Sequence, residues 1–298
     1  MIRKATLPLA VLMTLSLPTA IFAQTALPSP ADREGASVAV NGADIFYSES
    51  GEGDAIVLLH GFPLSGALFE KVRDKLDDTH RVVTIDHRGF GKSPTPAVVE
   101  SVTTYAEDAL AVMAKLDIKT AVIGGMSMGG PIAFEMYRQK PEVFSGLILI
   151  DSNAKPADPI EKGIWTGAGE VIETKGVAAI FPFLMGNMLT GATRAAKPED
   201  VAYLTAVMEQ ASPEGAVGGT KVLASRPDSM ATLTAVAVPI LVLVGEEDPV
   251  YAVELAKEMV AAAKDATLAV IPGASHAAIF EKPDDSSKAI LDWMAATN

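Results

Sequence analysis

Ser127 has the sequence setting of a nucleophile. It lies in the run Gly125-Met126-Ser127-Met128-Gly129, between an apolar stretch and a helical pattern that begins near Ile132. A serine on a sharp strand-to-helix turn is held in a strained conformation with its hydroxyl above the sheet, and the glycines make room for the close crossing of the chain. The free N–H groups at the start of the helix favour the oxyanion that forms when a carbonyl is attacked. We therefore predict acyl transfer with Ser127 as the nucleophile.

A serine hydroxyl needs a base, and the chain has four histidines. His276 lies in the loop after the last predicted strand, at the carboxyl end of the sheet, where the nucleophile also lies. His80 precedes a strand and His87 follows one, so we expect both at surface or loop positions. His60 ends a strand just before a Gly-Phe-Pro sequence and is expected to order that loop. His276 is therefore the predicted general base.

The base needs a carboxylate that holds its tautomer and stabilises the imidazolium. The strand predicted over 238–244 is followed by Gly-Glu-Glu-Asp-Pro, which places Asp248 at the same edge of the sheet. Glu246 and Glu247 are rivals for this role, and Asp151, at the end of an earlier strand, is a second choice. We prefer Asp248, because serine, aspartate and histidine then follow one another along the chain in the order that a nucleophile of this strand-turn-helix type keeps.

An alternation of strands and helices must position these residues. An Asn-Gly dipeptide at 41–42 predicts a hairpin over 36–50. Runs that are apolar on both faces predict buried strands over 55–59, 81–86, 120–124, 146–150, 238–244 and 267–271. Helical spacing predicts helices over 68–76, over 109–116 with a cap at Thr103 or Thr104, and over 132–139, 250–263 and 285–294. The fold class is therefore α/β, with a mostly parallel open sheet and helices on both faces.

The alternation of predicted strands and helices stops after Asp151 and resumes only after about residue 234. We interpret residues 152–234 as an inserted helical cap on a core formed by residues 24–151 and 235–298. Most apolar residues of the insertion should pack inside it, and some should line a pocket at the strand ends, where open α/β sheets bind ligands. The candidates are Trp165, Phe181, Phe183, Met185, Met188 and Leu189.

The first residues are typical of an export signal. Arg3 and Lys4 precede a mostly apolar stretch over 5–22, which small residues follow. A membrane-spanning helix is the alternative, but it needs about 20 uninterrupted apolar residues, and this stretch contains two prolines. We therefore expect a cleaved signal peptide over 1–23, with cuts after Ala20 or Ala26 as alternatives, no stable membrane anchor, and export to the periplasm or the medium.

The composition excludes several classes of function. The chain has 298 residues, no cysteine and a net charge of −13, which becomes −15 when the signal with Arg3 and Lys4 is removed. Without cysteine there is no disulfide, no thiolate nucleophile and no Cys-type metal site. Nucleic-acid binding is not expected, because the chain has no basic run. Four scattered histidines argue against a metal, so we expect no cofactor. The oligomeric state is not indicated.

Taken together, these segments resemble the α/β-hydrolases over essentially the whole chain after the signal. The resemblance rests on the serine turn, on Gly245 to Asp248, on the histidine loop, and on the runs His60-Gly61-Phe62-Pro63 and Asp86-His87-Arg88-Gly89-Phe90-Gly91-Lys92-Ser93. It implies a Ser-His-Asp mechanism in which the backbone N–H groups of Phe62 and Met128 form the oxyanion hole. Ser275 is a departure, because relatives often carry glycine before the histidine.

The run from Asp86 to Ser93 contains polar side chains that need a role. We assign Asp86, Arg88 and Ser93 to the architecture of their loop rather than to the chemistry.

The reaction expected from this resemblance is hydrolysis of a carboxylic ester or lactone. An apolar cap without a basic cluster indicates a small-molecule substrate that is uncharged or weakly polar. A serine nucleophile argues against haloalkane dehalogenases and epoxide hydrolases, which resemble one another in using aspartate. Carbon–carbon bond hydrolases, cofactor-free haloperoxidases or perhydrolases, and a non-catalytic binding protein of the same fold remain alternatives.

Overall fold

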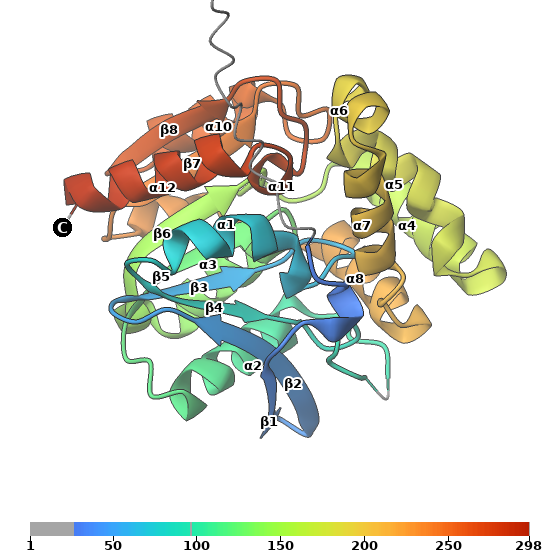
Figure 1. Ribbon diagram of the computed structural model, residues 1–298, viewed down its shortest axis with the longest axis horizontal. Helices are drawn as coiled ribbons and strands as arrows, with labels where there is room; N and C mark the ends of the chain where they lie inside the picture. Colours follow the sequence, from blue (N-terminus) through green and yellow to red (C-terminus); the bar gives the residue numbers. More distant parts are fainter. Residues whose placement is uncertain (1–26, 96, 298) are drawn as a thin grey trace, which may run out of the picture.

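An eight-stranded sheet forms the centre of the molecule, for which a computed structural model describes residues 27–95 and 97–297 (Figure 1). The strands lie in the order β1-β2-β4-β3-β5-β6-β7-β8. Their bounds are β1 (Ala36–Val40), β2 (Ala43–Ser50), β3 (Ala55–Leu59), β4 (Arg81–Ile85), β5 (Ala121–Met126), β6 (Phe144–Ile150), β7 (Ile240–Gly245) and β8 (Ala266–Ile271). The strands β3 to β8 are parallel to one another, whereas β1 and β2 form an antiparallel hairpin that pairs with β4 at one edge of the sheet. The predicted signal over 1–23 lies outside the described residues.

The hairpin at the edge of the sheet has the turn that its sequence predicts. Asn41 and Gly42 both have positive φ, 48° and 74°, as a two-residue turn of this hand requires. Val40 pairs with Ala43 directly across the turn. The hairpin is therefore confirmed, and β2 continues the antiparallel pairing onto β4.

The central strands carry side chains that are buried on both faces. Every residue of β5 and β7 is buried, as are all but the first residue of β3 and of β4. Such strands need a layer of helices on each side, which the structure supplies. In contrast, β8 is the strand at the other edge of the sheet, and Ile271 is the one residue in it that is fully buried.

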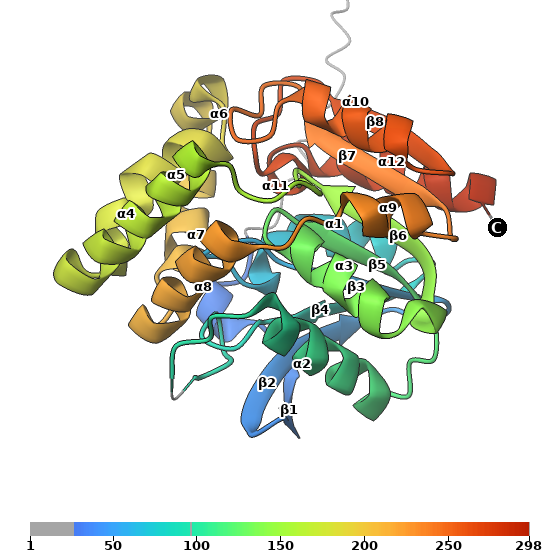
Figure 2. The ribbon, with the colours of Figure 1, turned by 180° about the vertical axis from the view of Figure 1, so that it is seen from behind.

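Helices cover both faces of the sheet. On the face toward the viewer in Figure 1 lie α1 (Glu70–Leu76), α11 (Ala278–Glu281) and α12 (Pro283–Thr297). On the opposite face, seen in Figure 2, lie α2 (Val102–Lys115), α3 (Gly129–Gln139), α9 (Met230–Ala235) and α10 (Val253–Ala262). This arrangement confirms the predicted α/β class with a mostly parallel sheet.

The start of α2 differs from the expected cap at Thr103 or Thr104. Ser101, which is still extended, accepts the N–H of Thr103 at 3.1 Å. An N-cap residue has non-helical dihedrals, and both threonines already lie inside the helix.

Five helices stand apart from the sheet layers, between β6 and α9. They are α4 (Pro159–Lys175), α5 (Phe181–Met188), α6 (Gly191–Ala196), α7 (Pro198–Met208) and α8 (Pro213–Ser225), and they lie together to one side of the sheet (Figure 1). Of these, α4 packs along α8, and α5 contacts α7. The last helix of the segment, α9, instead contacts α3 and α10. The division into a cap over 152–234 and a core stays a prediction.

Short 3-10 helices complete the described secondary structure. They are η1 (Pro30–Asp32), η2 (Gly66–Phe69), η3 (Pro141–Val143) and η4 (Val177–Ile180). In the described part of the chain, no helix is both long enough and apolar enough to cross a membrane.

Candidate active site

Ser127 occupies a tight turn between β5 and α3. Its φ is +50°, in the left-handed region that costs a residue with a side chain about 1–3 kcal/mol. Its N–H donates to the carbonyl of Ile150 at 2.9 Å. The glycines on either side allow the crossing, because a Cβ on Gly125 would lie 2.3 Å from the carbonyl oxygen of Gly129, and one on Gly129 would lie 2.2 Å from that of Leu59. The packing around the turn therefore holds Ser127 in its unfavourable conformation.

The structure brings Ser127, His276 and Asp248 together. The Nε2 atom of His276 lies 3.0 Å from the Ser127 Oγ, and its Nδ1 atom lies 2.9 Å from the Asp248 Oδ2. The other oxygen of Asp248 accepts the N–H groups of Val250 and Tyr251 at 2.7 and 3.1 Å. Because the Asp248 carboxylate accepts a hydrogen bond from Nδ1–H, the imidazole keeps its proton on Nδ1, and Nε2 is free to accept the serine proton. All three residues are buried and come from loops at the carboxyl ends of the strands.

The rival acids lie elsewhere. Glu246 accepts the N–H of Gly273 at 3.0 Å, and Glu247 is exposed. Asp151 is fully buried, but its two oxygens accept the N–H groups of Gly245 at 2.8 Å and Ala278 at 3.0 Å. Asp248 is thus the carboxylate that meets the imidazole, and Asp151 joins the loops that carry Asp248 and His276.

The two predicted oxyanion donors belong to two segments that are far apart in the sequence. Met128 is the N-cap of α3, and Phe62 follows β3. Within residues 27–95 and 97–297, neither N–H donates a hydrogen bond to another protein group. Both are therefore available to a substrate oxygen.

His60 orders the loop of Phe62. Its Nδ1 atom donates to the carbonyl of Gly61 at 2.9 Å, and its Nε2 atom accepts the N–H of His87 at 2.9 Å. Burial lowers the pKa of His60 to about 3, so the ring is neutral and keeps this tautomer. His87 lies in a loop, as expected, but is buried rather than at the surface, because its ring packs against those of His60 and Tyr105.

The loop after β4 is held by the side chains that we assigned to architecture. Asp86 accepts the N–H groups of Gly66 and Lys92 at 2.8 and 2.9 Å and pairs with the guanidinium of Arg33 at 2.5 Å. Arg88 pairs with a carboxylate of α2, and Ser93 bridges the Asp86 carbonyl to β2. None of these bonds involves Ser127 or His276.

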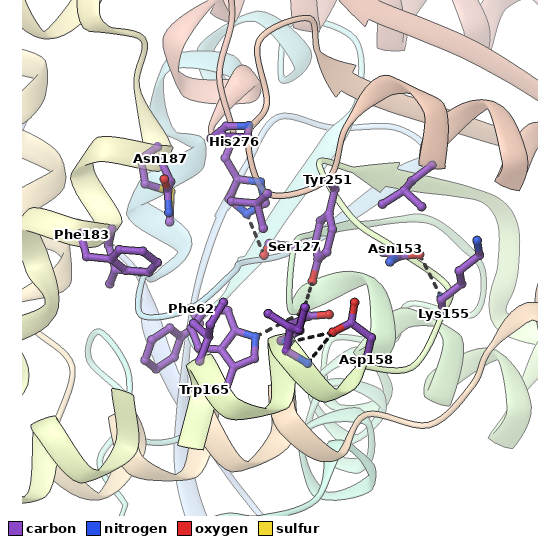
Figure 3. A pocket seen from close by; sticks show the side chains of 18 of the residues that line it. Phe62, Ser127, Asn153, Lys155, Asp158, Trp165, Phe183, Asn187, Tyr251 and His276 are labelled. Atoms are coloured by element: carbon purple, nitrogen blue, oxygen red, sulfur yellow. Dashed lines mark hydrogen bonds between the residues drawn. The ribbon is translucent and has the colours of Figure 1, made fainter. Parts of the chain in front are cut away.

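A cavity of about 590 Å³ opens at Ser127 and His276 (Figure 3). Its walls are mostly apolar side chains from the β3 loop, α4, α5, the β7 loop and α10: Phe62, Ile160, Ile164, Trp165, Phe183, Leu184, Met188, Pro249, Val250 and Leu255. Three of the apolar candidates, Trp165, Phe183 and Met188, line it. The other three, Phe181, Met185 and Leu189, are buried in the core.

The charged groups of the cavity wall are largely paired with other protein groups. Glu161 accepts hydrogen bonds from Arg226 at 2.5 and 2.6 Å, from the indole of Trp165 and from the hydroxyl of Tyr251. Asp158 caps α4, and Lys155 pairs with Glu258. Burial raises the pKa of Tyr251, whose hydroxyl therefore stays neutral. Charge pairing leaves the wall suited to an uncharged ligand.

Sequence reasoning missed Asn153 and Tyr251 in the cavity wall. Each follows a parallel strand by a few residues, β6 and β7 respectively, at the edge where ligands bind in such sheets. That position was the available signal. Within the described ranges, no group of three or more His, Cys, Asp or Glu side chains could hold a metal ion.

Comparison with known proteins shows matches along most of the chain. A family model described as alpha/beta hydrolase fold matches residues 54–283. An esterase from Thermogutta terrifontis, solved with malate bound, has a TM-score of 0.83 and 30% identity, over 88% of this chain and 97% of its own. A Synechocystis protein provisionally named a non-heme chloroperoxidase is 28% identical over 271 residues, which are 84% of this chain and 95% of that protein. The 3-oxoadipate enol-lactonase 2 of Acinetobacter baylyi is 26% identical over 254 residues, 85% of this chain and 93% of its own.

The family match covers far more than half of the sequence, including the serine turn and the histidine loop. The mostly parallel sheet with helices on both faces, and the serine on a strand-to-helix turn, agree with it. The chain therefore belongs to the alpha/beta hydrolase fold family and is a hydrolytic enzyme.

Proposed function

We propose that this protein is a serine hydrolase that cleaves a neutral carboxylic ester or lactone through an acyl-enzyme on Ser127. The observation that carries the proposal is the continuous chain of hydrogen bonds from Asp248 through His276 to the Ser127 hydroxyl, which ends at the apolar cavity. A nucleophile, its base and the group that orients the base are the parts that such a reaction needs.

In this proposal, His276 Nε2 takes the proton of the Ser127 hydroxyl while the oxygen attacks the substrate carbonyl carbon. The N–H groups of Phe62 and Met128 hold the resulting oxyanion, each contributing about 3 kcal/mol to the transition state. The imidazolium, stabilised by Asp248, then gives its proton to the leaving alcohol as the carbon–oxygen bond breaks. Water, activated by the same imidazole, attacks the acyl-enzyme, and the acid leaves with the serine restored.

The cavity wall supports a neutral substrate. A free carboxylate or ammonium on the substrate would lose its hydration without meeting an unpaired opposite charge, which is costly. The esterase and enol-lactonase among the similar proteins act, by their names, on esters or lactones. We therefore assign an ester or lactone whose groups near the scissile bond are uncharged.

One alternative has an observation in its favour. The Synechocystis relative bears the name of a non-heme chloroperoxidase. The same acyl-enzyme could be attacked by hydrogen peroxide in place of water, which would release a peracid. The proposal of hydrolysis requires that water is the faster acceptor under ordinary conditions.

A fluorophosphonate probe tests the nucleophile. We expect a covalent adduct on Ser127 of the wild-type protein and none in Ser127→Ala. Hydrolysis of p-nitrophenyl esters, lactones and vinylogous diketones should then favour the first two. A preference for the diketones, or ester hydrolysis that survives in Ser127→Ala, would contradict the proposal.

We also propose that the protein is exported and loses its signal. The segment over 1–23 has the sequence pattern of an export signal, and the chain has no cysteine that an oxidising compartment would affect. N-terminal sequencing of the protein recovered from the periplasm or medium should begin after Ala20, Ala23 or Ala26. An intact Met1 in that material would contradict this part of the proposal.

A further inference from the structure

The mouth of the active-site cavity carries large apolar side chains that face solvent. Ile160 is 76% exposed, Ile164 47% and Phe183 55%. Among the described residues, the only other exposed large apolar side chains are Val98 and Val270, which do not line the cavity. The exposed apolar surface is therefore concentrated at the opening that leads to Ser127. We call Ile160, Ile164 and Phe183 the apolar rim.

The rim is built from two helices. Ile160 and Ile164 are four residues apart on α4 and therefore share one face of that helix. Phe183 lies on α5, across from the Phe62 and Trp165 rings in Figure 3. Those two rings pack edge to face with their centroids 5.6 Å apart inside the cavity. The apolar surface thus continues from the interior of the cavity to its outer edge.

Exposed apolar side chains that gather at one cavity, instead of being scattered singly over the surface, mark a binding site. Its continuity with the cavity indicates that the occupant is part of the molecule that reaches Ser127. A lipid surface fits less well. Interfacial helices carry an excess of Lys and Arg beside their apolar face, whereas α4 carries Glu161, Glu170 and Glu173 against Lys162 and Lys175.

We propose that the substrate is a neutral ester or lactone with a hydrophobic tail that leaves the cavity and lies across the apolar rim. This inference rests on the proposed function, since it extends the site of that reaction. The chemistry occurs at the buried end, and the tail is held outside by side chains that touch no reacting atom. The rim residues therefore determine specificity and are not catalytic.

A chain-length series tests the proposal. The variant Ile160→Ser/Ile164→Ser/Phe183→Ser changes exposed side chains only. The matched control is Val98→Ser, a change of an exposed apolar residue away from the cavity. Each is assayed with p-nitrophenyl acetate and p-nitrophenyl decanoate below the solubility limit of the longer ester. We expect the triple variant to lose about 10- to 30-fold in kcat/KM for the decanoate and to stay within about twofold for the acetate. The control should match the wild type with both esters.

The possible results separate this proposal from the proposed function. An equal loss with both esters, or no loss with either, would overturn the role of the rim while the hydrolase stands. If the wild type hydrolyses neither ester and gives no fluorophosphonate adduct, the proposed function fails and this inference fails with it. A change in oligomeric state of the triple variant in gel filtration would assign the rim to a second copy of the chain instead.

Discussion

The imidazole of His60 accepts the backbone N–H of His87, and the two rings lie 4.4 Å apart in the interior. Burial lowers the pKa of His60 to about 3 and that of His87 well below its usual value. Both rings are therefore neutral in the folded protein, whereas in the unfolded chain each takes up a proton below a pH of about 6.5. As the pH falls from about 6.5 towards 3, unfolding binds protons that the native state does not hold, so stability falls.

This relationship predicts acid lability that a substitution should reduce. A histidine that stays neutral in the native state costs about 1.4 kcal/mol of stability per pH unit, from about 6.5 down to its native pKa. His87→Phe removes one titrating ring and keeps an aromatic side chain beside Tyr105. We expect urea unfolding between pH 6 and 4.5 to show a shallower loss of stability in His87→Phe than in the wild type. Parallel curves for the two proteins would contradict the assignment.

Ser127→Ala should abolish turnover without unfolding the protein. Loss of a serine nucleophile in an established triad lowers kcat by about 10⁴- to 10⁶-fold, and what is left comes from binding and the oxyanion hole. The alanine leaves the fold contacts of the turn in place. Steady-state ester hydrolysis and circular dichroism provide the measurements, and a residual rate within 100-fold of the wild type would count against the nucleophile.

Asp248→Asn should lower kcat by about 10⁴-fold, because an amide can present the wrong tautomer of His276 to the serine. The matched control is Glu246→Gln, which changes a neighbouring acid that bonds Gly273 and not the imidazole. The control should retain activity within about threefold, as exposed polar substitutions usually do. Equal losses in the two variants would show that the loop rather than the Asp248 carboxylate matters.

Asp151→Asn should impair the alignment of the acid and the base. The two oxygens of Asp151 each accept one N–H, from Gly245 and Ala278, whereas an amide must turn its NH₂ group toward one of these donors. We expect kcat to fall about 10- to 100-fold with little change in KM, since a small misplacement of catalytic groups costs this much. Asp200→Asn, a buried acid paired with Lys71 outside the site, is the control. An unchanged kcat in Asp151→Asn would remove Asp151 from this positioning role.

The parts of the molecule that local sequence determines were predicted well. The Asn41-Gly42 turn, the parallel strands and their order of appearance follow from apolar runs, turn residues and helical spacing, which are properties of neighbouring residues. Ser127 could be recognised because its turn needs glycines at fixed offsets. The predicted cap of α2 lies two or three residues too late: Ser101, Thr103 and Thr104 can all cap a helix, and the structure uses Ser101, the residue type that caps better than threonine.

The features that depend on distant contacts were harder to predict. The choice between Asp248 and Asp151 is decided by which oxygens the backbone N–H groups of other loops already occupy. The burial of His87 depends on the rings of His60 and Tyr105, from two other segments of the chain. The composition of the cavity wall depends on the position in which α4 and α5 pack beside the loops that carry Ser127 and His276. None of these contacts leaves a periodic pattern in the sequence.

The left-handed backbone at Ser127 puts stability and activity in conflict, because the residue that catalysis needs is not the one that fits this conformation best. A glycine would occupy that conformation without strain, so the variant Ser127→Gly should have a higher free energy of unfolding than the wild type. Selection for heat resistance alone would thus reward loss of the nucleophile, and only selection for turnover keeps the hydroxyl there. A search for heat-resistant variants of this enzyme should therefore measure activity in parallel, because a substitution at this position can raise thermal stability while it abolishes turnover.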